Sequence, residues 1–231
     1  MVEVKGGFGP EVEVGIARLR AEVAGLHTEL TQHELAVWTE GSVSGRVSGA
    51  DLFVIKPAGI AFAELAPENM ILCTLDGEVV DSTPGAGREP AADTAAHAHV
   101  YRAFPAVGGI AHTHSPYATA WAVQGEPIPC VTTSMAAEFG GEIPLGPLVR
   151  VDGRSGAEAG DAIGRVLVES LRRHAGTAVL MKNHGPYTTG PDARAAVKSA
   201  VLLEHAARVA HLARQLGELT TKSLTIGKET Q

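Results

Sequence analysis

The chain has 231 residues, of which 45% are hydrophobic and 4% aromatic, and its formal net charge is −7. This length and hydrophobic content suffice for one domain with a sizeable core, whereas the acidic balance argues against a nucleic-acid partner, because nucleic-acid binders usually carry a basic face. Cys73 and Cys130 lie far apart in apolar settings, so we expect neither a disulfide framework nor a thiolate zinc site. The sequence shows no signal-peptide core and no apolar run of membrane-spanning length, which predicts a cytoplasmic protein without membrane contact.

Helices and short strands follow one another along a single predicted domain, 1–231. Apolar residues at helical spacing predict a helix over 12–38, and two glycines bound a predicted turn at 41–45 that carries two serines. A β-branched run predicts a strand at 52–57, and Asp76–Gly77 between two apolar runs predicts an antiparallel hairpin over 71–80. The remaining predicted elements are helices at 93–104, 116–123, 155–174 and 192–216, a strand that carries His112, a strand at 178–183, and a polar tail at 218–231 that frays or packs loosely.

Two histidines, His112 and His114, follow an apolar stretch that is typical of a buried strand. Side chains at positions i and i+2 of a strand project from the same face, so both imidazoles can converge on one cation. Ser115 and Pro116 then predict the cap and first residue of a helix, which places the pair where a strand ends. The alternative is a pair of histidines that pack or face solvent, and the spacing alone does not decide between the two.

A third histidine and a carboxylate are available to complete a ligand set. His184 ends the predicted strand at 178–183 and precedes a glycine that permits a sharp backbone turn. Asp93 stands at a predicted helix N-terminus just before the His112 strand, where its alternative role is helix capping. Three histidines and one carboxylate suit a first-row divalent metal, so we expect one ion per subunit, with Zn²⁺ first and Mn²⁺, Co²⁺ or Fe²⁺ as alternatives.

Other histidines compete with this set. His97 and His99 also show the two-residue spacing, but on a helix such side chains lie roughly 200° apart and cannot reach one ion. We therefore interpret them as packing or surface residues, with support of Asp93 by His97 as the alternative. No partner pattern accompanies the remaining histidines, which are His27, His33, His174, His205 and His211.

With these residues in place, the chain resembles the class II aldolase family, most closely its L-ribulose-5-phosphate 4-epimerase branch. The resemblance implies an α/β domain with a mostly antiparallel central sheet flanked by helices, and a homotetramer with active sites at subunit interfaces. It also implies a divalent metal, usually Zn²⁺, on Asp93, His112, His114 and His184. The resemblance rests on six ordered motifs: Gly-Ser-Val-Ser at 41–44, Val-Ile-Lys-Pro-Ala-Gly at 54–59, Ala-Ala-Asp-Thr at 91–94, His-Thr-His-Ser at 112–115, Phe-Gly-Gly-Glu-Ile-Pro at 139–144 and Asn-His-Gly-Pro-Tyr at 183–187.

The chemistry that the resemblance implies is carbon–carbon bond cleavage in a small polyoxygenated, sugar-like substrate. The metal acts as a Lewis acid on a ketone and its adjacent hydroxyl and stabilises the enediolate that forms when the bond breaks. Aldolases release both fragments, whereas the epimerase rotates the aldehyde fragment and rejoins it. Both reactions need an acid or base in addition to the metal.

The chain departs from its relatives at the positions that bind the substrate phosphate. Ser42 replaces an asparagine of the epimerases, and Ala58, Ala91 and Ala92 replace three serines. Each hydrogen bond lost to a charged phosphate is worth roughly 1.5–3 kcal/mol. We therefore hypothesise that the physiological substrate is not the usual phosphosugar. The substrate-binding positions that the resemblance implies are Gly41, Ser42, Lys56, Ala58, Gly59, Ala91 and Ala92.

The acid/base groups also differ from those of the epimerases. Ala137 occupies the place of an epimerase aspartate, and the C-terminal Tyr-Gly-Gln segment that supplies the epimerase tyrosine is missing from this sequence. The candidates to replace them are Glu138 beside Ala137, Tyr187 beside the His184 ligand, and Asp93 acting as a base in the aldolase manner.

Three functions are compatible with this sequence. The first is a metal-dependent lyase or isomerase that acts through an enediolate. The second is a dehydratase, decarboxylase or iron-dependent oxygenase that acts on a non-phosphorylated compound in specialised metabolism. The third is a non-catalytic scaffold such as the adducin head domains. Metal identity and oxygen consumption separate the first two, whereas metal binding without substrate binding would indicate the third.

Overall fold

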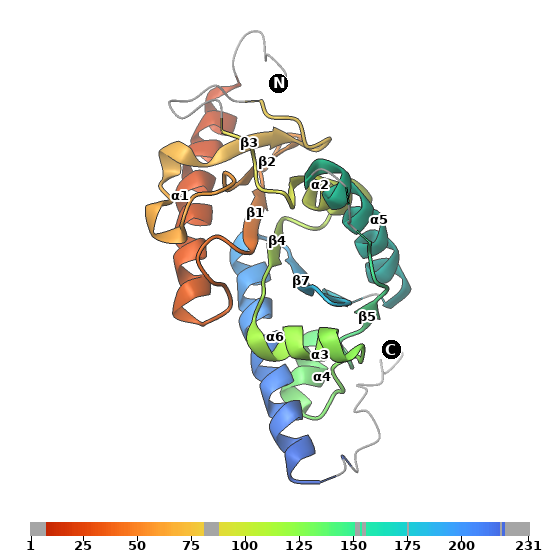
Figure 1. Ribbon diagram of the computed structural model, residues 1–231. Helices are drawn as coiled ribbons and strands as arrows, with labels where there is room; N and C mark the ends of the chain where they lie inside the picture. The colour runs from red at the N-terminus through yellow and green to blue at the C-terminus, as the bar shows by residue number, and fades with distance from the viewer. Residues whose placement is uncertain are drawn as a thin grey trace, which may run out of the picture.

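The computed structural model describes residues 8–80, 88–150, 153, 156–174, 176–217 and 219. Within them a single sheet forms the centre of one α/β domain, with the strand order β3-β2-β1-β4-β7-β6-β5 (Figure 1). All neighbouring strands pair antiparallel except β5 and β6, so the expected mostly antiparallel sheet is confirmed. The strands are β1 (Ser42–Arg46), β2 (Leu52–Ile55), β3 (Ile71–Thr74), β4 (Gly109–His112), β5 (Leu145–Gly146), β6 (Ala178–Met181) and β7 (Gly185–Gly190).

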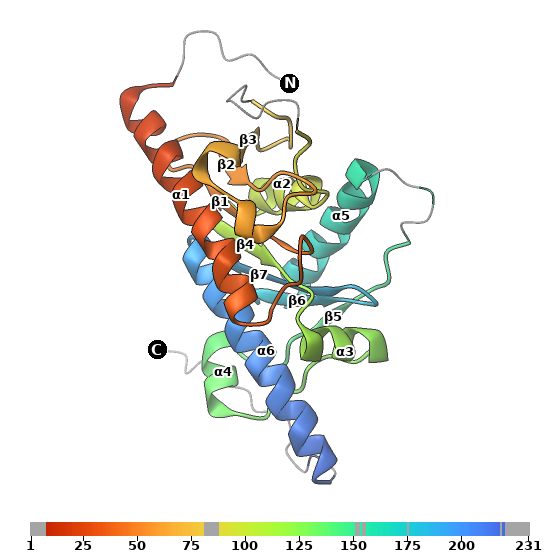
Figure 2. The ribbon, with the colours of Figure 1, turned by 60° about the vertical axis from the view of Figure 1, so that its left-hand side comes forward.

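Helices cover both faces of this sheet (Figures 1 and 2). One apolar cluster joins α1 and α6 to one face, and a second joins α2 and α5 to the opposite face. A third cluster packs α3 and α4 against α6 and β6. The helices are α1 (Pro10–Gln32), the 3-10 turns η1 (Phe62–Glu64) and η2 (Pro67–Asn69), α2 (Thr94–Ala103), α3 (Pro116–Gln124), α4 (Thr133–Phe139), α5 (Gly156–His174) and α6 (Ala193–Gln215).

Alternation along β2 shows how the sequence builds the two apolar layers. Leu52 and Val54 belong to the cluster on the α1 side, whereas Phe53 and Ile55 belong to the cluster on the α2 side. Successive strand residues point to opposite faces, and a strand that is covered on both sides therefore reads as a continuous apolar run. The predicted strand at 52–57 and the predicted hairpin, whose arms join through the pairing of Cys73 with Val79, are both confirmed.

The predicted turn at 41–45 is wrong, because residues 42–46 form β1, a central strand between β2 and β4. The two serines and the two bounding glycines led to the prediction of a turn. Ser42 and Ser44 are nevertheless fully buried, and their hydroxyls are hydrogen-bonded on the α2 side of the sheet. Val43 lies between them and belongs to the cluster on the α1 side. The side chains of β1 therefore alternate between the two faces of the sheet, but those on the α2 side are polar serines instead of apolar residues.

β7 was missed as well, because Gly185-Pro186 suggested a turn alone. Gly185 has another role, since a Cβ at this residue would lie 2.4 Å from the Thr113 carbonyl oxygen. The glycine thus allows β7 to approach the segment that carries the two histidines. The left-handed backbone conformation that reverses the chain falls instead on Asn183, with φ of 57°.

Four further sequence predictions concern the end of the first helix, the two cysteines, membrane-spanning helices and the C-terminal tail. The first helix ends at Gln32, six residues before its predicted end. Cys73 and Cys130 are buried and free, as expected. Within the part of the chain that the structure describes, no helix is long and apolar enough to cross a membrane. The predicted tail at 218–231 lies almost wholly outside the described residues.

Candidate metal centre

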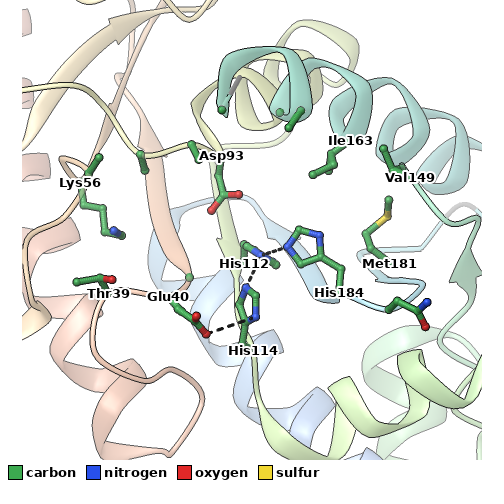
Figure 3. A pocket seen from close by; sticks show the side chains of 18 of the residues that line it. Thr39, Glu40, Lys56, Asp93, His112, His114, Val149, Ile163, Met181 and His184 are labelled. Atoms are coloured by element: carbon green, nitrogen blue, oxygen red, sulfur yellow. Dashed lines mark hydrogen bonds and ion pairs between the residues drawn. The ribbon is translucent and has the colours of Figure 1, made fainter. Parts of the chain in front are cut away.

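Three histidines from two segments of the chain meet where the internal strands β4 and β6 end and β7 begins (Figure 3). His112 is the last residue of β4, His114 follows two residues later, and His184 lies in the turn between β6 and β7. The Nε2 atom of His112 lies 3.1 Å from the Nε2 atom of His114 and 3.1 Å from that of His184. The predicted convergence of the three imidazoles is therefore present in the fold.

The protonation of His112 suits a metal ligand. Its Nδ1 lies 3.0 Å from the Pro186 carbonyl oxygen, which can only accept, so Nδ1 carries the proton and Nε2 offers a lone pair to the cluster. Burial lowers the pKa of His112 to about 3, despite the opposing effect of the Asp93 carboxylate. The ring also stacks on Tyr187, with centroids 4.0 Å apart and planes 8° apart. His112 is thus neutral and held in one orientation.

The spacing of the donor atoms fits a first-row metal. At Zn–N distances of 2.0–2.1 Å, two ligands in tetrahedral geometry place their nitrogens about 3.3 Å apart. Two of the separations, both 3.1 Å, come close to this value, and all three ligand atoms lie within 4.8 Å of one another. Among the histidine, cysteine and acidic side chains of the described residues, these three lie close enough together to share one metal ion. The residues present therefore fit the metal that the sequence predicted.

Asp93 lies beside this group but does not join it in the structure. Its carboxylate makes no capping bond at the start of α2, so the alternative role of helix capping is wrong. Instead it accepts a hydrogen bond from Ser42 Oγ at 2.7 Å and one from the Tyr187 hydroxyl at 3.2 Å. Burial opposes ionisation, but the His112 and His97 imidazoles and the Ser42 hydroxyl together hold the pKa of Asp93 well below its usual value. Asp93 as a fourth metal ligand stays a prediction.

A chain of buried hydrogen bonds extends behind Asp93. Ser44 Oγ lies 2.7 Å from His97 Nδ1 and 2.7 Å from the Tyr101 hydroxyl, and Ser42 Oγ lies 3.4 Å from His97 Nε2. All four side chains are buried, and burial lowers the pKa of His97 to about 4. His97 therefore supports Asp93 through Ser42, the alternative that the sequence had left open. The clue to this network was the pair of hydroxyls two residues apart, which a strand places on one face.

The other competing histidine is occupied elsewhere. His99 Nε2 lies 2.6 Å from an Asp161 carboxylate oxygen, which joins α2 to α5. The expectation that neither His97 nor His99 is a metal ligand agrees with the composition of the three-histidine group.

Glu40 was missed by sequence reasoning. One of its carboxylate oxygens lies 3.8 Å from His114 Nδ1, the nitrogen that faces away from the cluster (Figure 3). Gly41 follows with φ of 95°, and a Cβ there would lie 2.7 Å from the His112 carbonyl oxygen. The glycine thus brings Glu40 alongside the histidines. Only an acidic residue directly before a glycine marked this position in the sequence.

A pocket with a volume of about 440 Å³ opens over the histidines. Its lining brings together the three histidines, Asp93 and Glu40. It also includes all but one of the predicted substrate-binding residues: Gly41, Lys56, Ala58, Gly59, Ala91 and Ala92. Ser42 is the exception, because its side chain lies behind Asp93 and is fully buried. The predicted substrate positions therefore do converge, and Ser42 contacts the site through Asp93.

Lys56 places a buried cation in the pocket wall. The side chain is only 4% exposed, and its Nζ makes one long contact, 3.5 Å, with the Pro57 carbonyl oxygen and lies 5.6 Å from the centre of the Phe62 ring. Burial lowers the pKa of Lys56, whereas the Asp93 carboxylate raises it. A buried ammonium group with donors to spare is well suited to bind an oxygen atom of a ligand.

The structure does not bring the other two predicted catalytic residues into this pocket. Tyr187 is fully buried behind His112, and its hydroxyl points at Asp93. Glu138 lies on α4, lines a separate pocket against α6, and bonds to Ser199 at 2.9 Å and Lys198 at 3.0 Å. Within one chain Tyr187 therefore supports the site indirectly, and Glu138 could reach such a site only in another copy of the protein.

Comparison with known proteins shows the family and the fold of this chain. Residues 21–211 match the family described as class II aldolase and adducin N-terminal domain. The chain is 35% identical over 200 residues to L-ribulose-5-phosphate 4-epimerase UlaF of Salmonella paratyphi C, covering 85% of this chain and 86% of that protein. Two solved structures share the fold. YgbL from Klebsiella pneumoniae has a TM-score of 0.74 at 28% identity, covering 91% of this chain and 95% of YgbL. L-fuculose-1-phosphate aldolase from Thermus thermophilus has a TM-score of 0.70 at 22% identity, covering 87% of this chain and 97% of the aldolase. The chain therefore belongs to the class II aldolase and adducin N-terminal domain family.

Proposed function

We propose that this protein is a divalent-metal-dependent lyase or isomerase that cleaves or re-forms a carbon–carbon bond in a small polyoxygenated substrate. The observation that carries the proposal is the convergence of three histidine Nε2 atoms beneath a pocket that also holds Asp93 and Lys56. A scaffold without catalysis has no need for a ligand set and a substrate-sized pocket in the same place.

His112, His114 and His184 would hold the ion, with Asp93 beside them. When bound, a divalent cation supplies a Lewis acid that stabilises negative charge developing on a ketone oxygen and its neighbouring hydroxyl. Asp93 is ionised, lines the pocket and has its orientation fixed by Ser42 and Tyr187, so we assign it the role of general base. Lys56 presents its ammonium group to an oxygen atom of the substrate.

The proposed substrate is not L-ribulose 5-phosphate. Ala58, Ala91 and Ala92 line the pocket with methyl groups at positions where hydroxyls bind phosphate in the epimerases. Epimerisation also needs a second acid/base group, and Ala137 carries none. The support for this part of the proposal is that the metal ligands are kept while the phosphate-binding and proton-transferring side chains are replaced.

The family resemblance adds finer elements to the proposal. They are Zn²⁺ as the resident ion, a cytoplasmic location, and a homotetramer whose active sites lie at subunit interfaces. In such an assembly Glu138 of a neighbouring copy is the candidate for the second acid/base group.

The test is a substrate comparison with the Zn²⁺-loaded protein. We expect aldehyde release from unphosphorylated ketoses or keto acids, followed with an aldehyde-trapping reagent, to exceed turnover of L-ribulose 5-phosphate. Asp93→Asn should abolish that release, because it removes the carboxylate that acts as the base but leaves the three histidines. Efficient epimerisation of L-ribulose 5-phosphate would contradict the proposal, as would full activity of Asp93→Asn.

A further inference from the structure

The pocket over the histidines has two unlike walls (Figure 3). Lys56, Thr39 and Glu40 form a polar wall on one side of the three imidazoles. Ile163, Val149 and Met181 lie together on the other side. A ligand that reaches the histidines therefore meets a cation and a carboxylate in one direction and these hydrocarbon side chains in the other, where Lys182 and Asn183 line the pocket next to Met181.

Close packing of α5 against α2 fixes the apolar wall in position. A Cβ at Gly160 would lie 2.6 Å from the Ala92 carbonyl oxygen, so this glycine lets the two helices touch at the pocket. The pair between His99 and Asp161 ties the same helices together. Ile163, one turn after Gly160, is consequently held at the pocket surface and is only 5% exposed.

Leu148 extends this wall to the pocket mouth. It lines the same pocket and is 46% exposed, and it is one of the few large apolar side chains left open to water in the described part of the chain. Among the described residues, the side chains of Ala92, Ala159, Ile163 and Leu148 offer no hydrogen-bond donor to an anion. A phosphate placed against these four side chains would receive no hydrogen bond from them, whereas a hydrocarbon group would gain by burial.

We infer that the substrate carries an uncharged, apolar substituent on the side away from its chelating oxygens, and that this substituent lies on the wall formed by Leu148, Val149, Ile163 and Met181. The inference rests on the proposed function, because the metal-binding end of the substrate sets the direction in which the rest extends. It narrows the substrate class from polyoxygenated compounds in general to those with one hydrophobic end.

Hydroxamates test this assignment, since each chelates a metal through two oxygens and carries a variable group on the carbonyl carbon. Acetohydroxamate, hexanohydroxamate and phosphoglycolohydroxamate would be titrated into the Zn²⁺-loaded protein by isothermal calorimetry. We expect hexanohydroxamate to bind more tightly than acetohydroxamate by up to about four-fold per buried methylene. Phosphoglycolohydroxamate should bind no more tightly than acetohydroxamate.

Two variants make the comparison specific to the wall. Leu148→Ser should lower the affinity for hexanohydroxamate about three- to ten-fold and leave the affinity for acetohydroxamate unchanged, because only the longer chain reaches the pocket mouth. Leu212→Ser is the matched control, since Leu212 is 45% exposed on α6 and lines no part of this pocket.

The possible failures are distinguishable. Tightest binding by phosphoglycolohydroxamate, or equal hexanohydroxamate affinity in wild type and Leu148→Ser, would overturn the apolar assignment and leave the proposed function standing. If none of the probes bound to protein with its full complement of Zn²⁺, the proposed chelation would be wrong and this inference would fall with it.

Discussion

His27 makes stability depend on pH in a way that can be calculated from the structure. The imidazole is fully buried on α1, where Nδ1 contacts the Val23 carbonyl oxygen at 2.7 Å and Nε2 accepts the Val43 backbone N–H at 3.0 Å. A protonated Nε2 could not accept that hydrogen bond. Burial accordingly lowers the pKa of His27 from 6.5 to about 3.

The consequence follows from proton linkage. Below pH 6.5 His27 binds a proton in the unfolded chain but stays neutral in the folded chain. The free energy of unfolding therefore falls as the pH drops from 6.5 towards 3. Between pH 7 and pH 5 this one group removes about 2 kcal/mol of stability.

His27→Gln is the informative variant, because glutamine can accept from Val43 but does not titrate. The assay is urea unfolding of metal-free wild type and variant at pH 7 and pH 5. The remaining histidines titrate in both proteins and cancel in the comparison. Wild type should lose about 2 kcal/mol more than His27→Gln between the two pH values. An equal loss in both proteins would refute this account of His27.

Two further substitutions probe the packing around the site. Gly185→Ala should destabilise the protein by about 1–3 kcal/mol and lower its metal affinity, because the new Cβ would collide with the Thr113 carbonyl oxygen; thermal unfolding and metal titration measure both effects. Gly25→Ala, in α1 with no atom within 4 Å of the new Cβ, is its control and should be neutral or stabilising, and equal behaviour of the two variants would contradict the argument. Ser44→Ala should cost about 1–3 kcal/mol in chemical unfolding, because it deprives the buried Tyr101 hydroxyl of its partner, and unchanged stability would show that the network contributes nothing.

The convergence of the three histidines was the part of the candidate site that the sequence predicted best. His112 and His114 are two positions apart at a strand end, and that local spacing is what places both rings on one side. His184 is distant in sequence, but its motif ends a strand that lies in the same sheet. The apolar run of β2 was equally easy to interpret, because both faces of that strand are covered by helices.

The parts that were missed depend on contacts that no local pattern contains. Ser42 and Ser44 are residue types typical of loops, and their role in a buried strand depends on His97 and Tyr101, the partners that α2 brings to this face of the sheet. The hydrogen bonds of Asp93 could not be predicted for the same reason, since its partners Ser42 and Tyr187 come from β1 and β7. The division of the pocket into a polar and an apolar wall likewise requires α5 to be placed against α2.

Metal analysis of a single variant tests the central claim most directly. The His114 imidazole contributes one of the three converging nitrogens, and removing it leaves an incomplete ligand set. His174→Ala is the matched control, because His174 is an exposed histidine at the end of α5. We predict one divalent ion per chain in wild type and in His174→Ala, measured by plasma mass spectrometry after gel filtration, and loss of that ion in His114→Ala. Full metal content in His114→Ala would contradict the account.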